Sequence, residues 1–290
     1  MKMMKSKKIR RDTKRVFLKK GTCSRTFFYI LNREFGHPLE YEEQAVDPLA
    51  GGILQQGYQC GMLWGASCAL GAESFRRCGD RGLATGMTIK ATQNVMKSFI
   101  NRTKSADCLD ITSCDFSSKF NMAKFFFTGK FWSCFKLAEK WAPEAIKSAT
   151  EGLSIHQPDP PEQATSCSSE VVRKMGANDK EMVIVSGFAG GLGLSGSGCG
   201  ALSAAIWMTI LGRIREQKYK PTLADPVTEK ILMTFYEATG YEMECHKITG
   251  MRFKTVTDHT EFMKNGGCEK LINELADRRS SRGRQKGKIV

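Results

Sequence analysis

An internal repeat constrains this 290-residue chain more than any other feature of its sequence. Residues 50–66 align without a gap with residues 189–205, and eight of the seventeen aligned positions are identical. Each copy runs from Ala-Gly-Gly through a second glycine position to Cys-Gly. A repeat of this kind predicts two tandem homologous domains, which we expect to pack about a pseudo-two-fold axis.

The sequence on either side of the repeat predicts a mainly α-helical fold. Residues 22–24 open an apolar stretch that stops at Gly36, and residues 166–168 open its counterpart, which stops at Gly176. Apolar side chains recur at helical spacing around Phe99 and Phe235, whereas strand patterning is limited to short runs such as Met182–Val185. In each domain, a Gly-rich loop is expected to lead into a buried helix.

Changes in composition give the expected boundaries. Prolines and polar residues mark a linker between the two copies. We therefore expect a basic N-terminal tail (1–20), a first repeat domain (21–150), a Pro-rich linker (151–163), a second repeat domain (164–277) and a basic C-terminal tail (278–290).

The positive charge of the chain is confined to its two ends. The net charge is +14, and residues 1–20 and 278–290 together contribute +15, which leaves −1 for residues 21–277. The simplest interpretation is that both ends are disordered and keep the protein soluble. The alternative is that they attract phosphates or an acidic partner, but a neutral body predicts no specific nucleic-acid binding.

Two segments of the sequence bear on the location of the protein in the cell. Residues 13–19 resemble a twin-arginine export motif, but Arg25, Arg33 and Glu34 interrupt the apolar region that must follow it. We expect the cytoplasm, with twin-arginine export as the alternative. The uncharged run Val183–Gly212 is rich in glycine and is better explained by a buried loop and a buried helix than by a membrane span.

The glycine loop of the second copy has two interpretations. Gly191-x-Gly193-x-x-Gly196 fits a dinucleotide-binding fingerprint, yet Leu54 replaces the middle glycine in the first copy. What both copies keep is Gly-Gly, then Gly, then Cys-Gly. Glycines bring amide N–H groups close to a sulfur, and a helix N-terminus favours a thiolate. The loop is therefore predicted to stabilise a negatively charged sulfur at Cys60 and Cys199.

Eight of the eleven cysteines occupy matching places in the two copies, next to Gly, Ser, Thr or an acid at the expected ends of elements. They are Cys23, Cys60, Cys108 and Cys134 in the first copy and Cys167, Cys199, Cys245 and Cys268 in the second. The three without a counterpart, Cys68, Cys78 and Cys114, are interpreted as small buried apolar residues. No CxxC pair is present, which argues against a zinc ribbon, and His246 has no partner in the first copy.

This pattern resembles the redox-protein family named after its cysteines, C–GCAxxG–C–C, whose members are typically half as long. Here the resemblance covers both domains, with two departures: Met62 stands in place of the Ala in the first copy, and Ala204 in place of the last Gly in the second. The resemblance implies redox activity and an iron–sulfur cofactor, held by the eight matched cysteines with Gly61 and Gly200 beside them.

Three functions remain open at this stage. The first is electron transfer through a [2Fe–2S] or [4Fe–4S] cluster, one per repeat or one shared, with a redox partner protein. The second is thiol–disulfide chemistry with Cys60 and Cys199 as the attacking thiolates. The third is a zinc-stabilised interaction module. An electron-transfer or accessory role is favoured over a hydrolase or transferase, and a homodimer stays open.

Overall fold

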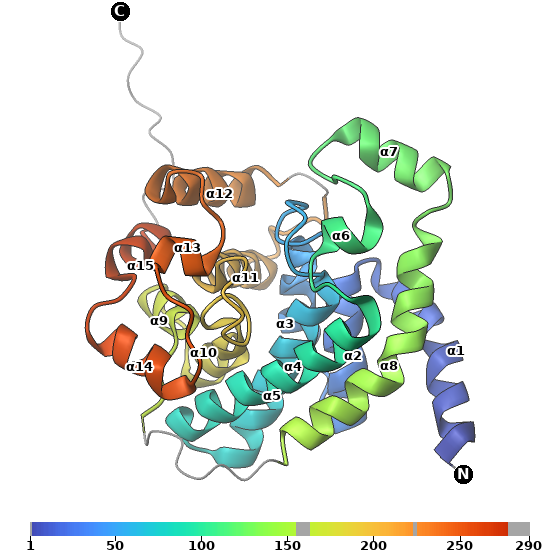
Figure 1. The fold of residues 1–290 in the computed structure, drawn as a ribbon, viewed down its shortest axis with the longest axis horizontal. Coiled ribbons are helices and arrows are strands. Elements are labelled where there is room, and N and C mark those ends of the chain that lie inside the picture. The colour runs from blue at the N-terminus through green and yellow to red at the C-terminus, as the bar shows by residue number, and fades with distance from the viewer. Residues whose placement is uncertain (1, 155–162, 223–224, 278–290) are drawn as a thin grey trace, which may run out of the picture.

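The computed structural model describes residues 2–154, 163–222 and 225–277, and in these ranges the regular elements are helices (Figure 1). Within these ranges the extended backbone pairs at two isolated bridges, Gln59 with Asp107 and Gly198 with Glu244. The two bridges occupy matching places in the two repeats. The expected mainly α-helical fold is confirmed.

The repeat in the sequence is a repeat in the structure. The first half contains α2 (Cys23–Phe35), α3 (Glu40–Ala45), η1 (Asp47–Leu49), α4 (Gly61–Cys78), α5 (Arg81–Thr103), α6 (Cys108–Thr112), α7 (Lys119–Phe127) and α8 (Trp132–Gly152). The second contains α9 (Cys167–Lys174), α10 (Asp179–Ile184), η2 (Ser186–Phe188), α11 (Gly200–Arg215), α12 (Pro226–Thr239), α13 (Cys245–Thr249), α14 (Val256–Lys264) and α15 (Glu269–Ala276). The same order of elements holds in both halves.

Local capping explains why the helices that open each half start where they do. The Thr22 hydroxyl accepts a hydrogen bond from the Arg25 amide at the start of α2, and Ser166 accepts one from the Ser169 amide at the start of α9. Gly36, with a φ of 85°, closes α2 in the left-handed conformation. The cysteines that follow Thr22 and Ser166 are thereby fixed as the first residues of their helices.

The halves pack through reciprocal contacts. Helix α4 of the first half lies against α10 of the second, so closely that a Cβ at Gly71 would fall 2.3 Å from the carbonyl oxygen of Val183. In turn α11 lies against α3, where the Trp207 indole donates to the Glu42 carbonyl at 3.2 Å. Because each half presents the same helix to the other, the arrangement is the expected pseudo-two-fold one.

The β-branched residues of the run Met182–Val185 had suggested a strand, but the run is not a strand. It forms the end of α10 and the residue that follows, because Asn178 and Glu181 make a capping box that starts the helix. The Asn178 side chain accepts from the Glu181 amide at 3.0 Å, and the Glu181 carboxylate accepts from the Asn178 amide at 2.9 Å.

The N-terminal basic segment is also ordered, contrary to the expectation of disorder. Residues Lys2–Lys20 form helix α1, which lies along α8 (Figure 1). Val16 and Phe17 are buried, and the Phe17 ring stacks on Phe135 with 4.2 Å between centroids. These apolar contacts outweigh the charge of the segment. The central part of the predicted linker, 155–162, and the C-terminal basic tail, 278–290, lie outside the described residues.

The apolar run Val183–Gly212 contains the end of α10, η2, the glycine loop and most of α11, as expected for a buried loop and helix. Across the described ranges, none of the helices has the length and apolar character needed to span a bilayer.

Candidate functional site

Every one of the eight matched cysteines lies at the start of a helix. Cys23, Cys108, Cys167 and Cys245 are the first residues of α2, α6, α9 and α13; Cys60, Cys199 and Cys268 are the N-caps of α4, α11 and α15; and Cys134 is in the first turn of α8. We call Cys23, Cys60, Cys108 and Cys134 the first set, and Cys167, Cys199, Cys245 and Cys268 the second set. Helix N-termini carry partial positive charge, which favours negatively charged sulfur.

The fold brings the members of each set together. Beyond the effect of burial, negative charge on Cys23 raises the pKa of Cys108 and Cys134. In the second set, Cys167 and Cys199 do the same to Cys245 and Cys268. All eleven cysteines are free thiols. Within the described residues, no three His, Cys, Asp or Glu side chains are arranged as a preformed site for one metal ion.

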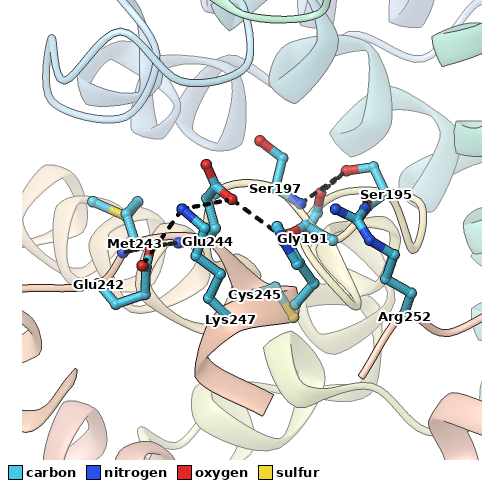
Figure 2. A network of polar contacts seen from close by, with 12 residues as sticks. Gly191, Ser195, Ser197, Glu242, Met243, Glu244, Cys245, Lys247 and Arg252 are labelled. Atoms are coloured by element: carbon cyan, nitrogen blue, oxygen red, sulfur yellow. Dashed lines mark hydrogen bonds and ion pairs between the residues drawn. The ribbon is translucent and has the colours of Figure 1, made fainter. Parts of the chain in front are cut away.

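The glycine loops tie two cysteines of each set to one another. In the second half, the Cys245 amide donates to the Ser197 carbonyl at 2.7 Å, just before Cys199, and Ser197 and Cys245 lie together in Figure 2. In the first half, the Cys108 amide donates to the Tyr58 carbonyl, also at 2.7 Å. These bonds are the source of the two isolated bridges, and they hold the α6 and α13 cysteines against the loops.

Backbone crowding explains the Gly-Gly that both loops share. Gly52 and Gly191 have φ values of 81° and 80°, and a Cβ at either position would fall within 2.6 Å of the backbone of residue 58 or 197. The loops are preceded by η1 and η2 and not by strands, so neither has the strand–loop–helix setting of a dinucleotide site.

The two predicted glycine sites differ in what surrounds them. A Cβ at Gly61 would lie 2.6 Å from the Cys23 sulfur, so this glycine leaves room for a member of the first set. A Cβ at Gly200 would instead lie 1.9 Å from the Phe188 carbonyl oxygen. Gly61 therefore borders the cysteine site directly, whereas Gly200 allows α11 to approach η2.

The sulfur with the most stabilised negative charge is Cys23. The Cys60 thiol donates a hydrogen bond to it and, with the Gly51 amide, holds the pKa of Cys23 below its ordinary value despite burial. The same hydrogen bond raises the pKa of Cys60, and burial raises that of Cys199 to about 12. Donation to Cys23 and burial therefore oppose the activation expected of Cys60 and Cys199 at their helix starts, and that activation stays a prediction.

Sequence patterns did not reveal the residue that connects the two sites, Gln59. Its side-chain amide donates to the Gly191 carbonyl at 2.8 Å, and its oxygen accepts from the Gly198 amide at 3.1 Å. Both partners belong to the glycine loop of the other half. The matching position in the second copy is Gly198, so the link runs in one direction only.

The three unmatched cysteines and His246 lie in different surroundings. Cys68 is fully buried in α4, as expected, whereas Cys78 is only half-buried, with its sulfur 3.9 Å from that of Met87. Cys114 is buried, as expected, and its charge raises the pKa of Cys108 and Cys134, which places it near the first set. His246 holds the second loop from outside, with Nδ1 2.8 Å from the Gly196 carbonyl oxygen.

The sequence profile of one family matches both halves, over residues 22–145 and 164–280. The family's description reads "Putative redox-active protein (C_GCAxxG_C_C)". The chain belongs to this family. It contains two tandem copies of the family's domain, each with one set of four cysteines. Comparison with curated proteins and with solved structures found no match.

Proposed function

We propose that the protein transfers electrons through iron–sulfur clusters, one held by the first set of cysteines and one by the second. The observation that carries this proposal is the convergence of four free thiols in each half, all buried or half-buried, at helix starts that belong to separate elements. Thiolate sulfur is the ligand that iron–sulfur clusters take in proteins.

The raised pKa values of the thiols favour binding of a positively charged metal centre. Burial and mutual repulsion raise the pKa of most of the eight, so a set of four thiolates is costly in the protein alone. Bound metal removes that cost, since a coordinating thiol is deprotonated outright. A cluster of several iron atoms also spreads its ligand sulfurs farther apart than one ion does, in agreement with sets that are close without being a preformed single-ion site.

The chain's own contribution would be to hold and polarise the sulfurs. Amides of Gly51 and Gly190 donate to Cys23 and Cys167, and amides of Ala201 and Leu202 donate to Cys199. Amide hydrogen bonds to cluster-bound sulfur stabilise negative charge and so raise a reduction potential. The cluster, when bound, would supply reversible one-electron chemistry.

The test is anaerobic purification followed by iron and sulfide analysis, visible absorption and electron paramagnetic resonance. We expect iron and sulfide in stoichiometric amounts and a visible spectrum that bleaches on reduction. A protein that stays colourless and iron-free after anaerobic reconstitution would falsify the proposal, and zinc without iron would favour the interaction module instead.

The Cys23–Cys60 hydrogen bond favours a second candidate, thiol–disulfide exchange. The Cys23 thiolate would attack a substrate disulfide and release one substrate thiolate, and the Cys60 sulfur would then displace the other and form a Cys23–Cys60 disulfide. In this role Cys23 replaces Cys60 as the attacking group. The test is whether the metal-free, reduced protein reduces a disulfide substrate. Activity that is lost in Cys23→Ser would establish this function.

A redox partner and a cytoplasmic location follow from the same proposal. Eleven free thiols suit a reducing compartment, and electron transfer requires a donor or acceptor protein. Fractionation of cells, with the protein detected by antibody, tests the location; recovery in an exported fraction would support the twin-arginine alternative.

A further inference from the structure

The two glycine loops differ in what covers them. In the second half, α5 of the first half closes over the loop, so that a Cβ at Gly193 would lie 3.2 Å from the Gln93 amide nitrogen, and Ile89 packs with Leu194. In the first half, the matching helix is α12, with 14 residues against 23 in α5. It reaches the loop through the Tyr236 hydroxyl, which donates to the Gln56 side chain.

A cavity of about 600 Å³ lies beside the first loop. Leu54 of the loop borders it, and so do three members of the first set, Cys23, Cys108 and Cys134. The opposite wall comes from α7 and the segments on either side of it, which contribute the rings of Phe116, Phe125, Phe126, Phe131 and Phe135. Several of these rings contact one another edge to face, and the wall is mostly aromatic.

The cavity also has a polar end. Arg25 and Tyr219 border it beside Asp47. The Arg25 guanidinium reaches Asp47 through Nη1 at 3.8 Å, whereas its buried Nε has no hydrogen-bond partner among the residues that the structure describes. A buried donor without a partner is costly unless a guest accepts its hydrogen bond. The matching residue of the second half is Ser169, which has no such charge.

We propose that this cavity binds a planar aromatic molecule that carries an oxygen acceptor, either a quinone carbonyl or an aromatic carboxylate. The volume lies within the range of small-molecule sites. The phenylalanine wall matches an aromatic ring, and the Arg25 end matches the oxygen. Three of the four sulfurs of the first set border the same cavity, so the guest could react at the cysteine site, and that role rests on the proposed function. The binding of the guest does not depend on the proposed function.

Equilibrium dialysis of the full-length protein, purified without oxygen, tests the inference with two probes. One is 2,3-dimethyl-1,4-naphthoquinone, whose methyl groups block addition of thiols, and the other is 2-naphthoate. We expect one of them to bind with a dissociation constant well below about 1 mM, the weak end of specific binding. Binding of the quinone alone identifies the carbonyl class, and binding of the carboxylate alone identifies the acid class.

Two variants and one control locate the bound probe. Met122→Trp adds bulk to α7 inside the cavity and should weaken binding about 10-fold or more, because the guest and the indole compete for one space. Arg25→Met should weaken it about 10-fold, the usual worth of a hydrogen bond to a charged group. Met263→Trp, on the matching helix α14, should leave binding unchanged.

The outcomes separate this inference from the proposed function. Protein that contains stoichiometric iron and sulfide but binds neither probe overturns the inference and leaves the proposed function intact. Iron-free protein that binds a probe, with the expected loss in Met122→Trp, supports the inference while the proposed function fails. Unchanged binding in both Met122→Trp and Arg25→Met places the probe elsewhere and overturns the inference.

Discussion

The first and second sets of cysteines have the same positions in the fold but different environments. In the first half, the Cys60 thiol donates to Cys23 and lowers its pKa, and the glycine loop borders an aromatic cavity. In the second half, burial raises the pKa of Cys167, and α5 covers the loop. The two copies keep the positions of the sulfurs, while packing by neighbouring helices leaves the first glycine loop beside a cavity and covers the second.

The largest effect is expected when each set is broken separately. Cys60→Ser should remove about half of the iron, the sulfide and the visible absorption, since a hydroxyl is a poor ligand for iron–sulfur clusters. Cys199→Ser should remove the other half, and the double variant should be colourless. Metal and sulfide analysis decides this. Loss of all iron from either single variant would show that the two sets share one cluster.

The core helices α4 and α11 differ at one matched position, where α4 has glycine and α11 has alanine. A Cβ at Gly65 would lie 1.9 Å from the Ser24 carbonyl oxygen, so Gly65→Ala should force α2 and α4 apart and cost about 3 kcal/mol of unfolding free energy. The matching residue is Ala204, where Ala204→Gly should cost only about 1 kcal/mol. Urea unfolding measures both, and equal costs would mean that the two halves pack alike.

Acid should affect the halves with opposite sign. Burial lowers the pKa of His259 from 6.5 to about 4, so the unfolded chain takes up a proton first and stability falls as pH drops from 6.5 to 4. Burial raises the pKa of Asp47 from 3.8 to about 6, so the folded chain takes up its proton first and stability rises over nearly the same window. Each contribution amounts to about 2–3 kcal/mol.

Matched variants separate these two effects in metal-free protein. Between about pH 7 and pH 4.5, His259→Gln should lose less stability than the unaltered protein, and Asp47→Asn should lose more. Urea unfolding at the two pH values provides the comparison. If both substitutions change the pH dependence in the same direction, the assignment of at least one buried group is wrong.

The smallest effect concerns the reactivity of the two opening cysteines. In reduced, metal-free protein, Cys23 should react with iodoacetamide about 10-fold faster than Cys167, because more of it is thiolate and it borders the cavity. Cys60→Ala should slow Cys23 by removing the hydrogen bond, whereas Cys199→Ala should not slow Cys167. Mass spectrometry of the alkylated peptides gives the rates, and similar rates for Cys23 and Cys167 would remove the distinction.

Much of the fold was predictable because the chain contains an internal repeat, so that each half could be compared with the other. The gapless match of residues 50–66 with residues 189–205 placed Cys60 and Cys199 at the starts of core helices, and the structure has them there. The helix at Met182–Val185 was missed because β-branched residues favour strands, while the capping box that decides the matter lies upstream at Asn178. The signal that decides this element therefore lies outside the repeated motif.

The parts that could not be predicted depend on contacts between distant residues. The lowered pKa of Cys23 comes from the sulfur of Cys60, 37 positions away, and no local pattern encodes the orientation of that thiol. Gln59 contacts Gly191 and Gly198 across the two halves, which only the assembled fold brings together. The cavity is lined by segments far apart in the sequence, from Phe17 to Thr228, and only the assembled fold brings them together.

The Gln59 contact also bears on how such a chain evolves. A Cβ at Gly198 would lie 2.7 Å from the Gln59 side-chain oxygen, so the amide fits only because its counterpart is glycine. Two identical subunits could not satisfy this arrangement, since each would carry the same residue at that position. A single chain with two copies can place glutamine at one position and glycine at its counterpart, so this contact depends on the two copies having different residues there.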